Sequence, residues 1–405
     1  MRTGHRRLFP VADNDPVNDL ALLLTPEGRA LLDEVRDTDP AQELAVATRL
    51  RREHPAELVS AALGQARLRQ RAVVKFGAED AGRMFFTPNG VEQSTRASVA
   101  AYRARRMAES GITSVADLCC GIGGDAIALA RAGIRVLAVD RDPQTVAAAR
   151  ANADALDLAG LVEVREADVT EADTAGFEAV FVDPARRGGR GRIFDPEAYS
   201  PPLSWAVAAA RRAPRAAALK IAPGIPHEAV PEDAEAEWIS DGGDVKEAVL
   251  WFGTEPGAVR ATLLPGPRTL LSRDLPDPDV RTPGRYLYEP DGAVIRAHLV
   301  AEVADQVDGG LLDATIAYVT ADALRPTPYA TAYEITDHLP FNVKKLKALL
   351  RERQVGTLTV KKRGSAVEPE ELRRKVKPQG PHAATVFLTR VAGAPAMLIG
   401  HPVRA

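Results

Sequence analysis

Cysteine and histidine are scarce in this sequence, and their scarcity excludes two ways of holding a fold together. The only two cysteines, Cys119 and Cys120, are adjacent, so they can form neither an ordinary structural disulfide nor a zinc site. The seven histidines are scattered without the spacing typical of metal ligands. We therefore expect no bound metal, and we expect the fold to depend on its apolar cores.

Long apolar runs and a large net charge are also missing. No run approaches the roughly 18–20 apolar residues that cross a bilayer, and no apolar segment follows the basic N-terminus as in a secretory signal. We expect a cytoplasmic protein without a membrane span. The net charge of −3 does not indicate a partner, whereas 405 residues with 45% hydrophobic content suffice for two or three domains.

The sequence does contain a strand, turn, helix and strand of the kind that binds nucleotide-like cofactors. Residues 115–118 form an apolar run typical of a buried parallel strand, and residues 134–139 predict the next one. Between them, Gly121 and Gly123 let the backbone turn tightly and approach a ligand. Asp140 ends the second strand, where open α/β sheets bind ligands and where a carboxylate can bind ribose hydroxyls.

This glycine turn has three interpretations. Residues 121–126 match the G-x-G-x-x-A fingerprint of NAD sites, and Asp140 follows at the spacing that the fingerprint requires. Against NAD, Asp117 occupies a strand position that is usually apolar, and Asp125 at the helix start would repel a pyrophosphate. Acids favour S-adenosylmethionine (SAM), which carries a sulfonium and an amino group. The third interpretation is a structural turn without a ligand.

Acidic residues also follow the next two predicted strands. Residues 161–167 predict a third strand before Asp168, and residues 177–182 predict a fourth that ends at Asp183. Any one of these acids could be an ordinary exposed residue at a strand end. Together with Asp117 and Asp140 they form a series along one sheet edge, which favours a ligand site there.

The segment after the fourth strand, Asp183-Pro184-Ala185-Arg186, resembles the D/N-P-P-aromatic motif of nitrogen methyltransferases. In that motif the acid or amide and a backbone carbonyl hold an amino group, so Asp183 and Pro184 are predicted to contact the methyl acceptor. Arg186 replaces the aromatic ring, and it could stack on a base or hold a phosphate. Methyl transfer to nitrogen depends mainly on positioning, so no acid–base pair is required. The alternative is that Asp183 only forms a turn before Pro184.

Two basic segments could contact a polyanion. A glycine-rich basic loop follows the fourth strand at once, and it is either a polyanion clamp or a solvated loop. Residues 344–377 hold twelve Lys or Arg and four Glu, an excess of +8, so the rest of the chain carries about −11. This asymmetry favours contact with RNA or DNA, and the alternative is a solvated helix face. The residues predicted to bind nucleic acid are Arg187, Arg190, Lys361, Lys362 and Arg363.

Taken in order, five motifs resemble a bacterial family of class I SAM-dependent methyltransferases with a C-terminal THUMP-like domain. The motifs occupy residues 92–95, 117–125, 182–187, 220–224 and 356–364. The resemblance implies an α/β fold with a Rossmann-like sheet, an N-terminal helical domain and a small C-terminal α+β region. It implies SAM as the cofactor, with Asp117 at its methionine portion and Asp168 at its adenine amino group. The residues expected to bind SAM are Asp117, Gly121, Gly123, Asp140 and Asp168.

The pattern of helices, strands and proline-rich sequence gives the expected domains. We expect a helical domain over 1–109, a methyltransferase domain over 110–255, a linker with a small ferredoxin-like segment over 256–329, and a basic THUMP-like domain over 330–405. Residues 91–107 predict a single helix within the first domain, and residues 291–322 predict strand, helix and strand within the third.

THUMP domains accompany tRNA-modifying enzymes, so the resemblance implies an RNA substrate. The expected function is methylation of a base nitrogen in tRNA or rRNA. A small-molecule methyltransferase with a structural basic tail is one alternative, and a non-catalytic RNA-binding protein is another. The sequence leaves the oligomeric state open.

Overall fold

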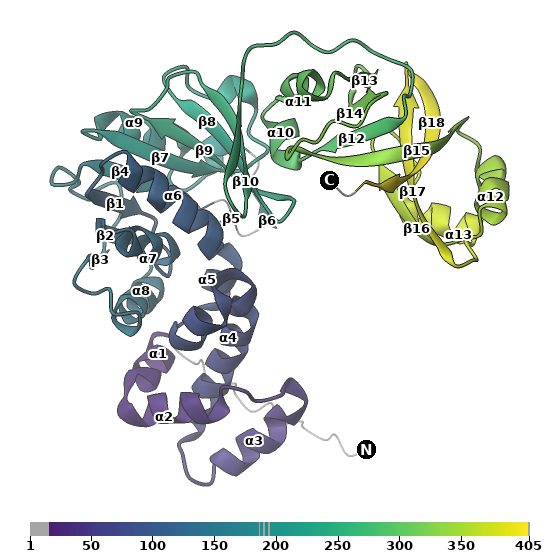
Figure 1. Ribbon diagram of the computed structural model, residues 1–405. Coiled ribbons are helices and arrows are strands. Elements are labelled where there is room, and N and C mark those ends of the chain that lie inside the picture. Colours follow the sequence, from purple (N-terminus) through teal and green to yellow (C-terminus); the bar gives the residue numbers. More distant parts are fainter. Residues whose placement is uncertain (1–15, 186, 189–190, 193–194, 404–405) are drawn as a thin grey trace, which may run out of the picture. The chain divides into compact units, whose positions relative to one another are not determined.

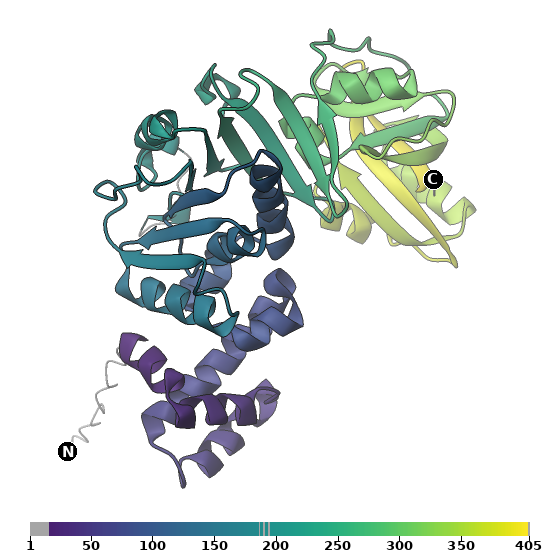
Figure 2. The ribbon, with the colours of Figure 1, turned by 60° about the vertical axis from the view of Figure 1, so that its left-hand side comes forward.

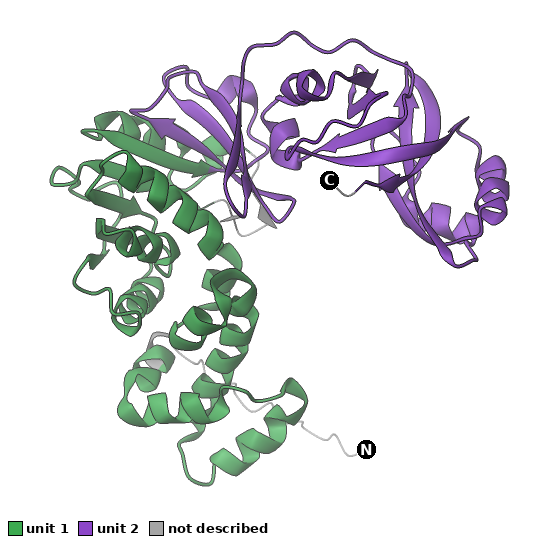
Figure 3. Cartoon of the chain, in the orientation of Figure 1, with its two compact units in different colours: residues 1–220 green, residues 221–405 purple. Residues whose placement is uncertain are grey.

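The computed structural model describes residues 16–185, 187–188, 191–192 and 195–403 (Figure 1). The chain divides into two compact units, residues 1–220 and 221–405 (Figure 3). Within the described residues, none of the helices combines the length and the apolar character needed to cross a bilayer.

The described part of the chain begins with four helices and a 3-10 turn, and the expected N-terminal helical domain is confirmed (Figures 1 and 2). They are α1 (Pro16–Leu24), α2 (Pro26–Val35), η1 (Pro40–Gln42), α3 (Glu43–Leu50) and α4 (Ala56–Arg83). Pro26 and Pro40 occupy first helical positions, where a missing N–H costs nothing. Buried leucines of these helices share one apolar core with Ile122 and Ile127, so the bundle packs directly on the glycine loop and the helix after it.

The single helix expected over residues 91–107 is two helices, α5 (Pro88–Gln93) and α6 (Ala97–Glu109), and that prediction was wrong. Neither glycine nor proline marks the break in the sequence. The break is stabilised from outside, because Lys75 Nζ donates to the carbonyl oxygens of Glu92 and Ser94 at 2.6 and 2.8 Å. The helix therefore ends despite its helix-forming sequence, because carbonyl oxygens at the end of α5 accept hydrogen bonds from a distant lysine.

The sheet of the first unit consists of parallel strands in the order β7-β4-β1-β2-β3. Its strands are β1 (Ser114–Leu118), β2 (Arg135–Asp140), β3 (Val162–Glu166), β4 (Ala179–Val182) and β7 (Ala216–Ile221). Its other elements are α7 (Gly124–Arg131), α8 (Pro143–Ala155), β5 (Arg187–Gly188), β6 (Gly191–Arg192), η2 (Pro196–Ala198) and α9 (Leu203–Arg212). Leu118 lies opposite both Val139 and Val182, so the carboxyl ends of β1, β2 and β4 meet at one edge. The predicted strands are confirmed.

Gly90 in α5 allows close packing against the glycine loop. A Cβ at this position would lie 2.6 Å from Ile122 Cγ2 and 2.9 Å from Thr87 Oγ1, which caps α5. Gly90→Ala is therefore expected to lower the free energy of unfolding by about 1–3 kcal/mol through overpacking. Urea denaturation measures this loss, with Gly160→Ala as the control because a Cβ there meets nothing within 4 Å. Equal stability of the two variants would contradict the packing.

The first strands of the second unit are β8 (Glu235–Asp241), β9 (Asp244–Phe252), β10 (Val259–Leu264) and β11 (Arg268–Leu271), preceded by η3 (His227–Ala229). The four strands adjoin in the order β11-β10-β8-β9. The expected linker after residue 255 is thus wrong over β10 and β11. Its prolines and glycines form the turns around these strands, and Gly266 has a φ of 67° in the turn between them. Thr262 is fully buried and donates to Glu237 Oε1 at 2.6 Å.

A seven-stranded sheet forms the rest of the second unit, in the order β13-β14-β12-β15-β18-β17-β16. Its strands are β12 (Tyr286–Pro290), β13 (Gly310–Asp313), β14 (Ile316–Ala321), β15 (Ala330–Pro340), β16 (Val355–Lys362), β17 (His382–Val391) and β18 (Ala394–Pro402). Its helices are α10 (Gly292–Arg296), α11 (Val300–Val307), α12 (Val343–Glu352) and α13 (Pro369–Val376). Residues 291–322 hold two helices and then two strands, so the expected strand–helix–strand order was wrong. β17 and β18 form an antiparallel pair, and the Asn342 side chain caps α12.

Candidate active site

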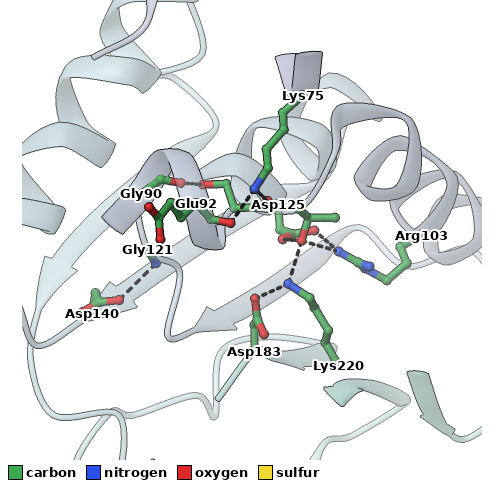
Figure 4. Close-up of polar contacts among 11 residues, drawn as sticks. Lys75, Gly90, Glu92, Arg103, Gly121, Asp125, Asp140, Asp183 and Lys220 are labelled. Atoms are coloured by element: carbon green, nitrogen blue, oxygen red, sulfur yellow. Dashed lines mark hydrogen bonds and ion pairs between the residues drawn. The ribbon is translucent and has the colours of Figure 1, made fainter. Parts of the chain in front are cut away.

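A pocket of about 440 Å³ lies where β1, β2 and β4 end (Figure 4). The glycine loop, the break between α5 and α6, and the strand ends line it. Its ionisable and hydroxyl side chains include Thr95, Asp117, Asp125, Asp140, Asp183 and Lys220. Three of the four acids of the predicted series, Asp117, Asp140 and Asp183, thus lie around one cavity.

The glycine loop is held in shape by backbone conformation and by Asp140. Gly121 and Gly123 have φ angles of 56° and 85°, in the left-handed region that favours glycine. Gly121 N donates to Asp140 Oδ2 at 3.0 Å, and Asp142 N donates to Oδ1 at 3.1 Å. Gly123 precedes α7 as its N-cap and does not line the pocket. Asp140 therefore closes the loop onto the end of β2.

Asp117 is an unpaired acid that lines this site. It is fully buried, and neither of its oxygens has a hydrogen-bond partner among the residues that the structure describes. Burial raises the pKa of this carboxyl well above its usual range, and the neighbouring Asp125 and Asp183 raise it further. Such a group is costly unless a cation or donor compensates it, so the pocket suits a positively charged ligand.

A chain of polar contacts links the other side of the pocket (Figure 4). Lys220 Nζ donates to Asp183 Oδ2 at 2.6 Å and to Thr95 Oγ1 at 2.9 Å. Thr95 Oγ1 in turn donates to Asp125 Oδ2 at 3.0 Å, and Arg103 forms an ion pair with Asp125. Lys220 is only 4% exposed, so its charge is available to Asp183 rather than to solvent. This chain holds the Asp183 carboxylate in one orientation.

Asp168 lies apart from the main pocket. It is exposed, and its Oδ1 accepts hydrogen bonds from Thr170 N at 2.9 Å and Thr170 Oγ1 at 2.7 Å. These bonds hold the pKa of the Asp168 carboxyl below its usual range. It lines a second cavity of about 250 Å³, and Cys119, Asp140 and Ala185 line both cavities. The two cavities therefore adjoin at the end of β2.

The other predicted site residues have varied positions. Asp183 and Pro184 line the main pocket, whereas Arg186 and Arg190 lie outside the described residues. The backbone of Arg187 belongs to β5.

The basic residues at the end of β16 and directly after it already have partners within the second unit. Lys361 pairs with Glu289, and Lys362 Nζ lies 2.6 Å from Glu368 Oε1. Arg363 is 3.9 Å from Glu289 and its guanidinium lies over the Tyr318 ring at 5.2 Å.

Both cysteines belong to the glycine loop of the first unit, and their thiols are expected to be unreactive. Burial raises the pKa of the Cys119 and Cys120 thiols well above the usual range, and the nearby acids raise it further. At neutral pH the folded protein should therefore be alkylated by iodoacetamide much more slowly than the urea-unfolded chain. Mass spectrometry of the tryptic peptide measures this ratio. Fast alkylation of the folded protein would contradict the burial of the two thiols.

The parallel sheet, the glycine loop and the acids at its strand ends define a Rossmann-like class I methyltransferase. Family models agree: a methyltransferase domain matches residues 115–184, a THUMP-like domain matches residues 330–402, and a domain of unknown function matches residues 15–72. A crystal structure from Porphyromonas gingivalis W83, named as a candidate methyltransferase, has a TM-score of 0.77 at 22% identity. It covers 96% of this chain and 98% of its own, so the two folds are alike throughout.

Curated relatives identify the family. Two uncharacterised SAM-dependent methyltransferases of Mycobacterium tuberculosis, from strains CDC 1551 and H37Rv, are each 33% identical to this chain over 338 residues. The match covers 80% of this chain and 90% of each relative. The chain belongs to this bacterial family of SAM-dependent methyltransferases, and it is an enzyme that uses SAM. An uncharacterised RNA methyltransferase of Parasynechococcus marenigrum is 33% identical over 91 residues, 22% of this chain and 20% of that protein.

Proposed function

We propose that this enzyme transfers the methyl group of SAM to a base nitrogen of RNA, either tRNA or rRNA. The observation that carries the proposal is the Asp183 carboxylate, which lines the cofactor pocket and is oriented by Lys220. The argument has three parts: the residues that hold SAM, the residues that hold the acceptor nitrogen, and the surfaces that bind RNA.

The unpaired Asp117 carboxylate supports the assignment of the main pocket to SAM. SAM supplies an electrophilic methyl group on a sulfonium and carries a second positive charge on its amino group. A cation beside Asp117 would compensate a buried carboxylate that otherwise lacks a partner. Asp140 is assigned to the ribose hydroxyls and Gly121 to the close approach of the loop. Asp168 in the adjoining cavity is assigned to the adenine amino group, and Gly123 to the turn that starts α7.

The hydrogen bonding of the Asp183 carboxylate supports nitrogen as the methyl acceptor. Its Oδ2 atom is bound by Lys220, whereas Oδ1 accepts no hydrogen bond from the described part of the chain. Oδ1 can therefore accept a hydrogen bond from a base N–H, with the Pro184 carbonyl beside it. As the N–C bond forms and the C–S bond breaks, the sulfur leaves as the neutral thioether of S-adenosylhomocysteine. The nitrogen becomes positively charged and then loses a proton to solvent. A fixed carboxylate stabilises that charge, and positioning supplies the rest. Arg186 is assigned to the base or its phosphate.

Three observations support RNA as the acceptor. Residues 330–402 match a THUMP-like domain, and residues 344–377 carry an excess of +8. The local similarity to a protein named as an RNA methyltransferase points the same way. The proposed RNA contacts are Arg187, Arg190, Lys361, Lys362 and Arg363.

A small-molecule acceptor is the second candidate. The pairing of Lys361 with Glu289 and of Lys362 with Glu368 favours it, because both charges are already partly neutralised. A methyltransferase whose basic tail is structural would show such pairs. Transfer that persists unchanged in a Lys361, Lys362 and Arg363 triple alanine variant would favour this candidate.

The experiment is transfer of radiolabelled methyl from SAM to total RNA from a strain that lacks the gene. Label should appear in a discrete RNA species, disappear after ribonuclease treatment and be absent with Asp183→Ala. Label that survives ribonuclease, or that enters small molecules only, would contradict the proposal.

A further inference from the structure

A separate cavity, lined only by residues between 221 and 405 in the described part of the chain, has the features of a nucleotide-binding site. It has a volume of about 620 Å³ and shares no lining residue with the methyltransferase pocket. Its lining comes from the loop after β7, from the start of β9, from α10 and the residue two positions beyond it, and from the turn after β16. The residues used below are His227, Glu228, Arg296, His298 and Arg363, which all line it.

Three rings are stacked in a column beside this groove. The ring centroids of His298 and His227 lie 3.7 Å apart at 10°, and those of His227 and Trp238 lie 4.7 Å apart at 11°. Trp238 is 1% exposed and its Nε1 donates to the Pro223 carbonyl at 3.0 Å, which fixes the inner end of the column. His298 at the outer end is exposed. The column thus presents a flat imidazole to the groove on a rigid support.

One further contact fixes the orientation of the His227 imidazole. His227 Nε2 lies 2.8 Å from the Arg296 carbonyl oxygen, so this nitrogen carries a proton and donates. His298 follows α10 with a φ of 59°, in the left-handed region. The His227 ring is therefore held in place before any ligand arrives, and the His298 ring stacks on it.

The charge in the groove favours an anion. Arg296 is exposed and pairs with no carboxylate in the part of the chain that the structure describes. Arg363 lies 3.9 Å from its nearest carboxylate, Glu289, which is a long ion pair. Among the described residues, Glu228 is the only acid that lines the groove, against the two guanidinium groups. An arginine that has no protein partner and lies two residues from a stacking ring is suited to a phosphate.

We propose that this groove binds one nucleotide of single-stranded RNA, with its base stacked on His298 and its phosphate held by Arg296 and Arg363. Proteins recognise unpaired nucleotides through this combination of a ring and guanidinium groups. The inference rests on the proposed RNA substrate and extends it, because it assigns RNA contact to a surface outside the pocket where the methyl group is transferred. Of Lys361, Lys362 and Arg363, it gives Arg363 the direct contact.

The test is fluorescence anisotropy of the full chain with a short fluorescein-labelled single-stranded RNA. His298→Ala should weaken binding roughly ten- to a hundredfold, since stacking on one base is worth about that much. His298→Phe should retain the affinity, because it keeps a flat ring. His382→Ala is the matched control, since His382 is also exposed and lies outside the groove. Arg296→Gln should reduce the slope of log Kd against log salt by about 0.7.

Two outcomes would overturn this groove as a nucleotide site. One is the same RNA affinity in His298→Ala as in His382→Ala. The other is an equal loss for a fully double-stranded RNA, whose paired bases present no face for stacking. Binding of SAM by each variant is measured in parallel, because it should not change if the variants are folded.

The groove and the proposed function can fail separately. Loss of RNA binding in His298→Ala, in an enzyme that labels no RNA, would support the groove and overturn RNA methylation. RNA labelling by wild type, with unchanged RNA binding by His298→Ala, would support RNA methylation and overturn the groove as a nucleotide site.

Discussion

Replacing Asp183 by alanine is expected to lower the rate of methyl transfer by about a hundred- to a thousandfold. The variant loses the carboxylate proposed to bind the acceptor nitrogen and to stabilise the charge that develops on it. It also leaves Lys220 without one of its two hydrogen-bond acceptors, so the fold of the variant is checked by its SAM affinity. Single-turnover rates with saturating SAM measure the effect on chemistry alone.

Asp183→Asn is the matched variant for this prediction. Asparagine keeps the shape and one oxygen acceptor, so it should lose much less activity than alanine does. A rate for Asp183→Ala within a few fold of wild type would remove Asp183 from the reaction. Equal losses in the two variants would mean that the negative charge, and not the hydrogen bond, is what the reaction needs.

Asp117→Asn is expected to weaken SAM binding by about a hundredfold, or roughly 3 kcal/mol, because it removes the buried negative charge opposite a cationic ligand. Calorimetry of SAM binding measures the change. The free protein should respond in the opposite way. The pKa of Asp117 is raised well above its unfolded value, so this carboxyl destabilises the free fold as pH rises above about 4. Asp117→Asn removes this destabilisation, so the free variant should be more stable than wild type at neutral pH.

The same carboxyl should make SAM affinity depend on pH. A cation favours the ionised form, so SAM binding to wild type should tighten as pH rises through the raised pKa of Asp117. The comparison belongs below about pH 7, where the amino group of SAM keeps its own proton. Asp117→Asn should show no such dependence. A wild-type affinity that stays constant over this range would contradict a cation at Asp117.

Local pattern was enough to predict the methyltransferase sheet and part of its site. The strands β1, β2 and β4 are largely apolar, and the acid in or after each strand is visible in the sequence, so Asp117, Asp140 and Asp183 could be placed at one edge. Gly121 and Gly123 could be assigned to a turn because only glycine adopts their conformation easily. The break between α5 and α6 could not be predicted, since it depends on Lys75, which is seventeen residues away from Glu92.

The polar chain behind Asp183 could not be predicted for the same reason. Thr95, Arg103 and Lys220 come from three separate elements and meet only in the folded protein. Lys220 stood in a recognisable motif, but nothing in that motif indicated its partner. The groove at His298 was still harder to predict from the sequence, because an isolated histidine does not indicate that its ring stacks on two others. Contacts between distant segments carry the functional detail that periodicity misses.

The most direct test of the central claim is nucleoside mass spectrometry of RNA treated with the enzyme and SAM. The RNA comes from a strain that lacks the gene, and Asp183→Ala is treated in parallel. We predict one new methylated nucleoside whose added mass stays with the base after the sugar is lost, and whose fragmentation assigns the methyl group to a nitrogen. A methyl group on the ribose, on a base carbon, or on no nucleoside at all would contradict the account.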